Sequence, residues 1–174
     1  MEKTLRSKFV FECPIFKVEE AEVELPDGRV EKRWYVVNAD AVLVMPIDAD
    51  GNLVLIREWA SAMQRRVTKL VAGKVDEGED PADAAQRELR EETGYAAKSL
   101  EYIGNIPAFG NWQKQNKFFF VARDLYPSPL QGDEFEQAEL LPTPRDEVLR
   151  KIEAGELRGD IATALRQLIY KEKK

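Results

Sequence analysis

GKVDEGEDPADAAQRELREETGY, residues 73–95, is the most informative segment of this chain. Asp80 is suited to cap the free amides at the start of a helix, and Pro81 suits the first turn, where its missing N–H is not needed. Gly94 stands where a left-handed residue commonly ends a helix. We therefore predict a tight loop at Gly73 and a helix between Asp80 and Gly94.

The predicted helix carries three glutamates on one face. Glu88, Glu91 and Glu92 are spaced i, i+3 and i+4, and like charges at that spacing destabilise a helix by roughly 0.2–0.5 kcal/mol per pair. A solvated surface is the ordinary explanation in a chain with 33% charged residues. The alternative is a divalent cation, because Mg²⁺ takes oxygen ligands and combines a few carboxylates with water and substrate phosphates.

The same stretch fits a longer pattern of fixed identities and spacings. In order along the chain these are Gly73, five residues, Glu79, seven residues, Arg87-Glu88-Leu89, one residue, Glu91-Glu92, one residue, and Gly94-Tyr95. This resembles the Nudix box, GX5EX7REUXEEXGU, at every fixed position. Seven identities at about 5–7% each give a chance match on the order of 10⁻⁹ per window, so the surface explanation becomes the weaker one.

The resemblance implies a hydrolase that uses divalent cations to activate a pyrophosphate. Carried over by position, Glu88 and Glu92 are the principal metal ligands, the Ala72 carbonyl is a further ligand, and Glu91 is a catalytic residue beside them. Glu79 is placed to reach Arg87, which would orient the neighbouring carboxylates. The expected cofactor is Mg²⁺, with Mn²⁺ as a substitute.

Strand patterns precede the box. Residues 9–38 alternate apolar and charged side chains around a Pro26-Asp27-Gly28 turn, which predicts an antiparallel hairpin with one solvated face. Residues 41–47 and 53–57 are two apolar runs joined by Asp48-Ala49-Asp50-Gly51, which predicts a second hairpin that contains a buried central strand.

After the box, residues 100–106 and 117–121 are strand-like, and the tail reads as two amphipathic helices separated at Gly155. We predict an α/β fold, a Nudix-like α/β/α sandwich with a mixed central sheet and an N-terminal antiparallel β-hairpin extension. Residues 1–38 would form this extension, and residues 39–174 the Nudix hydrolase domain.

The N-terminal extension resembles the ADP-ribose and nucleotide-sugar pyrophosphatase branch of the family, and this resemblance spans roughly residues 9–170. In that branch the extension helps to form a homodimer with a shared substrate pocket. The segment Asp133-Glu134-Phe135-Glu136 matches the acidic loop of the branch. This makes Glu134 a candidate general base and Glu136 a further metal ligand or base, while Glu91 remains the alternative base.

Two positions depart from the usual pattern of that branch. Ala60 stands where relatives commonly have arginine, and Lys69 stands where they have an acidic residue. Both lie near regions that relatives use for substrate contact, so the resemblance does not fix ADP-ribose itself as the substrate. Lys69 is a candidate contact for a phosphate.

Other side chains are candidates for substrate binding. A cluster of Arg57, Arg65 and Arg66 is suited to hold the distal phosphate. Trp59 and Trp112 could stack on a base or sugar. Packing is the alternative for each of them, and for Trp112 it is an equal one.

Composition excludes several other classes of site. The chain has 174 residues and no histidine, which removes Ser-His-Asp triads and His-ligated metals. The lone Cys13 makes no internal disulfide, and a net charge of −6 argues against nucleic acid as a partner. The N-terminus has no apolar signal core and no run is long enough to span a bilayer. We expect a cytoplasmic protein with no membrane partner.

The leading functional hypothesis is hydrolysis of a nucleoside diphosphate sugar, of the ADP-ribose or GDP-mannose type, to a nucleoside monophosphate and a sugar phosphate. A nucleoside triphosphate pyrophosphatase is the rival enzyme, although the long N-terminal extension argues against it. A sensor that binds nucleotide sugars without turnover is the rival from another class, and the complete set of carboxylates argues against that.

Overall fold

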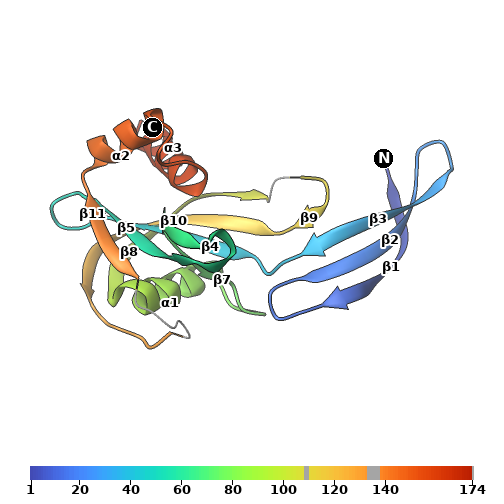
Figure 1. The fold of residues 1–174 in the computed structure, drawn as a ribbon, viewed down its shortest axis with the longest axis horizontal. Coiled ribbons are helices and arrows are strands. Elements are labelled where there is room, and N and C mark those ends of the chain that lie inside the picture. Colours follow the sequence, from blue (N-terminus) through green and yellow to red (C-terminus); the bar gives the residue numbers. More distant parts are fainter. Residues whose placement is uncertain (108–109, 133–137, 174) are drawn as a thin grey trace. The chain divides into compact units, whose positions relative to one another are not determined.

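The computed structural model describes residues 1–107, 110–132 and 138–173, and the chain forms two compact units (Figure 1). Unit 1 consists of Met1–Asp40 and Ile106–Lys117, and unit 2 of Ala41–Asn105 and Phe118–Lys174. No helix among the described residues is long and apolar enough to cross a membrane.

Unit 1 is a sheet with the order β1-β2-β3-β9. Its strands are β1 (Lys3–Glu12), β2 (Lys17–Glu24), β3 (Val30–Val37) and β9 (Gln113–Lys114). The first three are antiparallel and β9 runs parallel to β3. The predicted N-terminal antiparallel strands are confirmed, but β1 starts earlier than the pattern indicated. All ten residues of β1 are exposed, so no buried face marks its start in the sequence.

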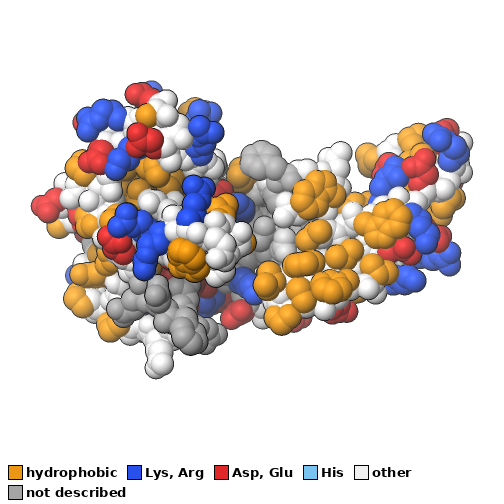
Figure 2. Space-filling model, in the orientation of Figure 1, with side chains coloured by type: hydrophobic (Ala, Val, Ile, Leu, Met, Phe, Trp, Pro, Cys, Tyr) orange, Lys and Arg blue, Asp and Glu red, His pale blue; other side chains and the backbone are white. Residues whose placement is uncertain are grey.

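Hydrophobic side chains gather on the surface of this sheet, as the space-filling view of unit 1 shows (Figure 2). Seven large apolar residues of the N-terminal strands and turns are 47% exposed or more: Leu5, Phe9, Val10, Phe11, Ile15, Val30 and Trp34. Such a concentration is unusual for a surface that faces only water.

Unit 2 holds two further sheets, with the orders β7-β4-β10-β8 and β11-β5-β6. Their strands are β4 (Ala41–Pro46), β5 (Leu53–Ala60), β6 (Arg65–Lys69), β7 (Val71–Lys74), β8 (Tyr95–Pro107), β10 (Asn116–Pro127) and β11 (Glu139–Thr143). A short 3₁₀ helix, η1 (Ser61–Met63), connects β5 to β6. The chain passes from one sheet to the other at Leu70, between β6 and β7.

The predicted second hairpin is wrong in its pairing, although its turn is present. Gly51 has φ 82° as the turn requires, but β4 and β5 lie in different sheets and share only the isolated bridge Ile47–Leu53. Both runs are buried, and each takes other neighbours: β4 pairs with β7, and β5 pairs with β6 and β11. Continuous apolarity predicted their burial but could not tell which strands would be partners.

Three α-helices in the described part of the chain cover unit 2: α1 (Pro81–Thr93), α2 (Arg145–Glu153) and α3 (Asp160–Glu172). In Figure 1, α1 lies on one side of the strands and α2 and α3 lie on the other. This arrangement confirms the predicted α/β/α sandwich. The core under α1 joins Leu89 of the helix to Val42, Val44 and Val71 of the sheet, each of which has no exposed surface.

Candidate active site

Helix α1 begins and ends where the sequence predicts. The Asp80 carboxylate accepts a hydrogen bond from the Ala82 amide at 2.8 Å, and Pro81 opens the first turn. Gly94 closes the helix at φ 77°. Gln86 fixes the helix against β8, because its side chain exchanges hydrogen bonds with the backbone of Ala97. Helix α1 is thus fixed at both ends and against β8, independently of Arg87 and the glutamates.

The buried face of α1 directs two of the three glutamates inward. Leu89 packs in the core with no exposed surface, and the Glu92 side chain is only 2% exposed. The Glu88 side chain is 13% exposed and that of Glu91 is 20% exposed. Glu88 and Glu92 therefore lie beneath the helix, while Glu91 lies nearer its edge.

Gly73 lies in strand β7, opposite Val42 of β4, rather than in the predicted loop. A β-carbon at this position would fall 1.8 Å from the carboxyl carbon of Glu88. The Glu88 carboxylate thus packs directly on the glycine backbone. Glycine is needed here for close approach, because its φ is not in the left-handed region.

Arg87 joins the carboxylates into one network, as the sequence predicts. Its guanidinium holds the Glu79 carboxylate through two nitrogens, at 3.0 and 2.9 Å, and also donates to the Lys74 carbonyl at 2.9 Å. The remaining nitrogen donates to Glu88 at 2.6 Å and to Glu91 at 3.2 Å. One side chain therefore sets the positions of three carboxylates.

The charges in this network perturb one another. The hydrogen bonds that Arg87 donates to Glu79 hold the pKa of Glu79 below its ordinary value. The same hydrogen bonds raise the pKa of Arg87 further above its usual range. Arg87 and Glu79 are therefore both ionised at neutral pH.

The Glu92 carboxylate is held by two different donors. One oxygen accepts a hydrogen bond from the Ala72 amide at 2.9 Å, and the other accepts one from the Lys69 ammonium at 3.0 Å. Ala72 is the residue whose carbonyl we predicted as a metal ligand, so its peptide lies beside the predicted carboxylate ligand.

Lys69 is a second organising cation that the sequence analysis assigned differently. It is the last residue of β6 and lies opposite Ile56, which places it diagonally beside Glu58 on the same face. Its ammonium contacts Glu58 at 2.9 Å as well as Glu92. Burial lowers the pKa of Lys69, but the two carboxylates outweigh this and keep the pKa above its ordinary value.

Glu58 is thus part of the site, although the sequence analysis gave it no role. The signal that could have found it is the diagonal pairing of Glu58 and Lys69 on adjacent antiparallel strands. The sequence does not show that pairing until the register of β5 and β6 is known.

The donor chemistry of the site fits a hard divalent cation. Glu88 and Glu92 offer only oxygen donors, and the bare backbone at Gly73 leaves room for a carboxylate close to the Ala72 peptide. Within residues 1–107, 110–132 and 138–173, no group of three acidic or thiol side chains is already arranged around a common metal position. Arg87 and Lys69 are the groups that hold these carboxylates.

The predicted acidic loop lies outside the described residues, and with it Glu134 and Glu136. Its N-terminal approach is described: a β-carbon at Gly132 would lie 3.2 Å from the Glu91 side chain. The chain therefore passes close to Glu91 just before the acidic segment.

The predicted phosphate-binding arginines occupy β5 and β6. The Arg57 guanidinium holds both oxygens of the Glu139 carboxylate, at 2.9 and 2.7 Å, so it is already engaged across the β5–β11 pair. Arg65 and Arg66 are exposed. Trp59, which is 48% exposed, lies opposite Arg66 in the ladder.

Trp112 belongs to unit 1, where its carbonyl accepts a hydrogen bond from the Val36 amide at 2.8 Å. The residue is 55% exposed. The indole nitrogen lies against Gly110, where a β-carbon would approach it to 2.8 Å.

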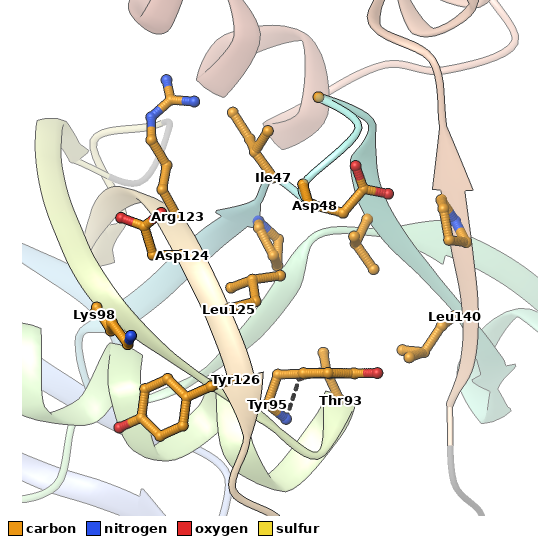
Figure 3. Close-up of a pocket in the computed structure, with 15 residues that line it drawn as sticks. Ile47, Asp48, Thr93, Tyr95, Lys98, Arg123, Asp124, Leu125, Tyr126 and Leu140 are labelled. Carbon is orange, nitrogen blue, oxygen red and sulfur yellow. Dashed lines mark hydrogen bonds between the residues drawn. The ribbon is translucent and has the colours of Figure 1, made fainter.

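A cavity of about 800 Å³ lies elsewhere in unit 2, between the ends of β4 and β10 and strand β11 (Figure 3). Ile47, Asp48, Lys98, Arg123 and Tyr126 are among the residues that line it. Of the predicted metal ligands and substrate contacts that the structure describes, none lines this cavity, so the cavity does not mark the carboxylate site.

Comparison with protein families gives two matches. Residues 37–161 match the model described as NUDIX domain. Residues 2–42 match the model described as nucleoside diphosphate sugar hydrolase N-terminal domain. The first match contains the whole carboxylate network of Arg87, and the second contains β1, β2 and β3.

Named relatives agree with these matches. The ADP-ribose pyrophosphatase of Bacillus subtilis (strain 168) is 29% identical over 98% of this chain and 94% of the relative. The ADP compounds hydrolase NudE of Escherichia coli (strain K12) is 36% identical over 69% of this chain and 65% of the relative. A crystal structure of an ADP compounds hydrolase matches 99% of this chain and 94% of its own, with a TM-score of 0.88 and 28% identity.

Proposed function

Because the chain belongs to the Nudix hydrolase family, we propose that it cleaves the pyrophosphate bond of nucleoside diphosphate sugars. The products would be a nucleoside monophosphate and a sugar phosphate. One observation carries the proposal: a single chain joins the carboxylate network of α1 to an N-terminal segment that matches nucleoside diphosphate sugar hydrolases. ADP-linked sugars are the leading candidates, since the relatives are named for ADP-ribose and ADP compounds.

The carboxylate site would supply the electrostatic part of the reaction. Glu88 and Glu92, with the Ala72 carbonyl, would hold Mg²⁺, for which Mn²⁺ is expected to substitute; when bound, the ion neutralises charge on the phosphoryl oxygens. Arg87 keeps Glu88 and Glu91 in place through hydrogen bonds from one guanidinium nitrogen. Glu79 in turn fixes Arg87, so the arrangement exists before substrate arrives.

A carboxylate must also orient the attacking water and accept its proton. Glu91 is the candidate within the described residues, because it is the most exposed of the three helix glutamates and Arg87 holds only one of its oxygens. Glu134 is the other candidate and Glu136 a further metal ligand, both on the basis of the family's acidic loop.

The arginines and tryptophans are proposed to bind the rest of the substrate. Arg65 and Arg66 are exposed and suited to a phosphate. Arg57 would have to exchange the Glu139 carboxylate for the substrate. Trp59 and Trp112 present exposed rings for a base or sugar.

The N-terminal strands are proposed to form a homodimer. The exposed apolar residues of unit 1 would be covered by a second copy of the chain, which explains why β1 has no buried residue in a single copy. Light scattering should give twice the mass of the 174-residue chain. A single-chain mass at micromolar concentration would contradict this part of the proposal. The cytoplasmic location stays a prediction.

The test of the proposed function is product analysis with Mg²⁺ on a panel of ADP-ribose, GDP-mannose, UDP-glucose, CDP-choline, a dinucleoside polyphosphate and dGTP. We expect the highest kcat/KM for a nucleotide sugar, with a nucleoside monophosphate and a sugar phosphate as products. Activity on dGTP alone, with release of pyrophosphate, would overturn the proposal in favour of a triphosphate pyrophosphatase. Binding without any product would favour a sensor.

A further inference from the structure

We infer that Lys69 is a positioning residue that holds the Glu92 carboxylate when no divalent cation is bound and competes with the cation for it. Removing the Lys69 ammonium should therefore tighten binding of a divalent cation. The inference rests on the proposed role of Glu92 as a metal ligand, and it concerns binding of the metal alone, without substrate.

The Glu92 carboxylate is buried and is held by donors of two kinds. Its side chain is 2% exposed, so an ionised carboxylate there needs a partner at all times. The Ala72 amide satisfies one oxygen at 2.9 Å, and Lys69 satisfies the other at 3.0 Å. Ala72 is part of the β4–β7 ladder, whereas Lys69 reaches Glu92 through a flexible side chain. Lys69 is therefore the partner that a cation can displace.

The Lys69 ammonium lies 3.0 Å from one oxygen of Glu92, so it would lie close to any divalent cation that the carboxylate held. Two cations on one oxygen repel each other strongly in a partly buried site. The ammonium must then move toward its other partner, Glu58, which it already contacts at 2.9 Å.

Glu58 makes this exchange possible without leaving a buried charge unpaired. Its side chain is 24% exposed and that of Lys69 is 28% exposed, so the pair stays partly solvated after Glu92 is released. The Lys69 ammonium can thus pair with either carboxylate, Glu58 or Glu92. Substitutions of the two residues should therefore have opposite effects. Loss of Lys69 should tighten metal binding, and loss of the Glu58 charge should weaken it.

The experiment is calorimetric titration of the full-length protein with MnCl2 alone, together with thermal unfolding with and without Mn²⁺. For Lys69→Met we expect about tenfold tighter Mn²⁺ binding, the size of effect that one nearby charge produces. We also expect a lower Tm without metal and a larger rise of Tm on adding Mn²⁺ than in the wild type. For Glu58→Gln we expect weaker Mn²⁺ binding. Lys69→Gln serves as a second variant should Lys69→Met fail to fold.

Lys114→Met is the matched control, because Lys114 also pairs with a glutamate, Glu19, but in unit 1. It should leave Mn²⁺ affinity unchanged. Unchanged or weaker Mn²⁺ binding in both Lys69 variants would overturn the inference and reduce Lys69 to a structural ion pair. Glu92→Gln tests whether Glu92 is a metal ligand at all. If this variant binds Mn²⁺ as the wild type does, the ligand assignment fails, and the role of Lys69 fails with it.

Discussion

Replacement of Gly73 by alanine tests whether close packing on the glycine backbone sets the position of the Glu88 carboxylate. The new β-carbon would lie 1.8 Å from the Glu88 carboxyl carbon and 2.0 and 2.1 Å from its two oxygens. Carbon atoms in contact are separated by about 3.5 Å. The carboxyl group must therefore retreat by roughly 1.7 Å, the difference between 3.5 and 1.8 Å.

This displacement should lower activity while leaving the stability of the fold nearly unchanged. The atoms that must move are the end of a flexible side chain, and Gly73 has no left-handed φ that alanine would strain. Alanine in a strand is also favoured over glycine by roughly 0.5–1 kcal/mol. We expect the free energy of unfolding to change by less than about 1 kcal/mol, whereas kcat/KM should fall about 100-fold or more, as misplacement of a catalytic group by about 1 Å does.

The assay is a double-mutant cycle of Gly73→Ala and Glu88→Gln, with kcat/KM and urea unfolding measured for all four proteins. Because both changes act through one carboxylate, the double variant should be no less active than Glu88→Gln alone. Wild-type activity in Gly73→Ala would refute the placement of Glu88 on the glycine backbone. Additive losses would show that Gly73 acts through something other than Glu88.

Four further predictions concern the same helix. Glu92→Gln should fold yet lower turnover by two or more orders of magnitude, as measured by steady-state kinetics beside circular dichroism; wild-type turnover would remove Glu92 from the ligand set. Arg87→Lys should not rescue Arg87→Ala, because three ammonium donors cannot replace five hydrogen bonds of a planar guanidinium; equal kcat/KM for Arg87→Lys and wild type would contradict this. Leu89→Ala should lower the free energy of unfolding in urea by about 2–5 kcal/mol, because the side chain has no exposed surface; a loss below about 1 kcal/mol would argue against its packing. The pKa of Glu79 is depressed in the folded state, so its contribution to stability is complete above the ordinary glutamate pKa and is lost as pH falls through the lowered value. Between pH 7 and pH 3, the free energy of unfolding should therefore fall less steeply in Arg87→Met than in the wild type. Parallel curves for the two proteins would contradict the coupling.

Much of the site could be predicted from sequence because it depends on local spacing. The cap at Asp80 and the left-handed end at Gly94 follow from helix rules, and the structure shows both. Helix spacing also brings the three glutamates near one another, with Glu88 and Glu92 more buried than Glu91. The pairing of Glu79 with Arg87 was also predicted, since the two side chains flank the first turns of one helix.

What the sequence could not predict depends on which strands become neighbours. The roles of Glu58 and Lys69 require the register of β5 against β6 and the passage of the chain between two sheets at Leu70. The predicted hairpin of β4 with β5 failed for the same reason, because an apolar run indicates burial but names no partner. Gly73 was predicted in a loop, and only its contact with Glu88 shows why glycine is needed within a strand.

Phosphorus NMR of ADP-ribose incubated with the protein and Mg²⁺ in ¹⁸O-labelled water tests the proposed activity most directly. We expect the two pyrophosphate resonances to give way to two phosphomonoester resonances, AMP and ribose 5-phosphate, with label on one of them. Glu92→Gln should show no such change in the same time. If neither ADP-ribose nor any other nucleotide sugar of the panel yields phosphomonoesters, the assignment as a nucleoside diphosphate sugar hydrolase is contradicted.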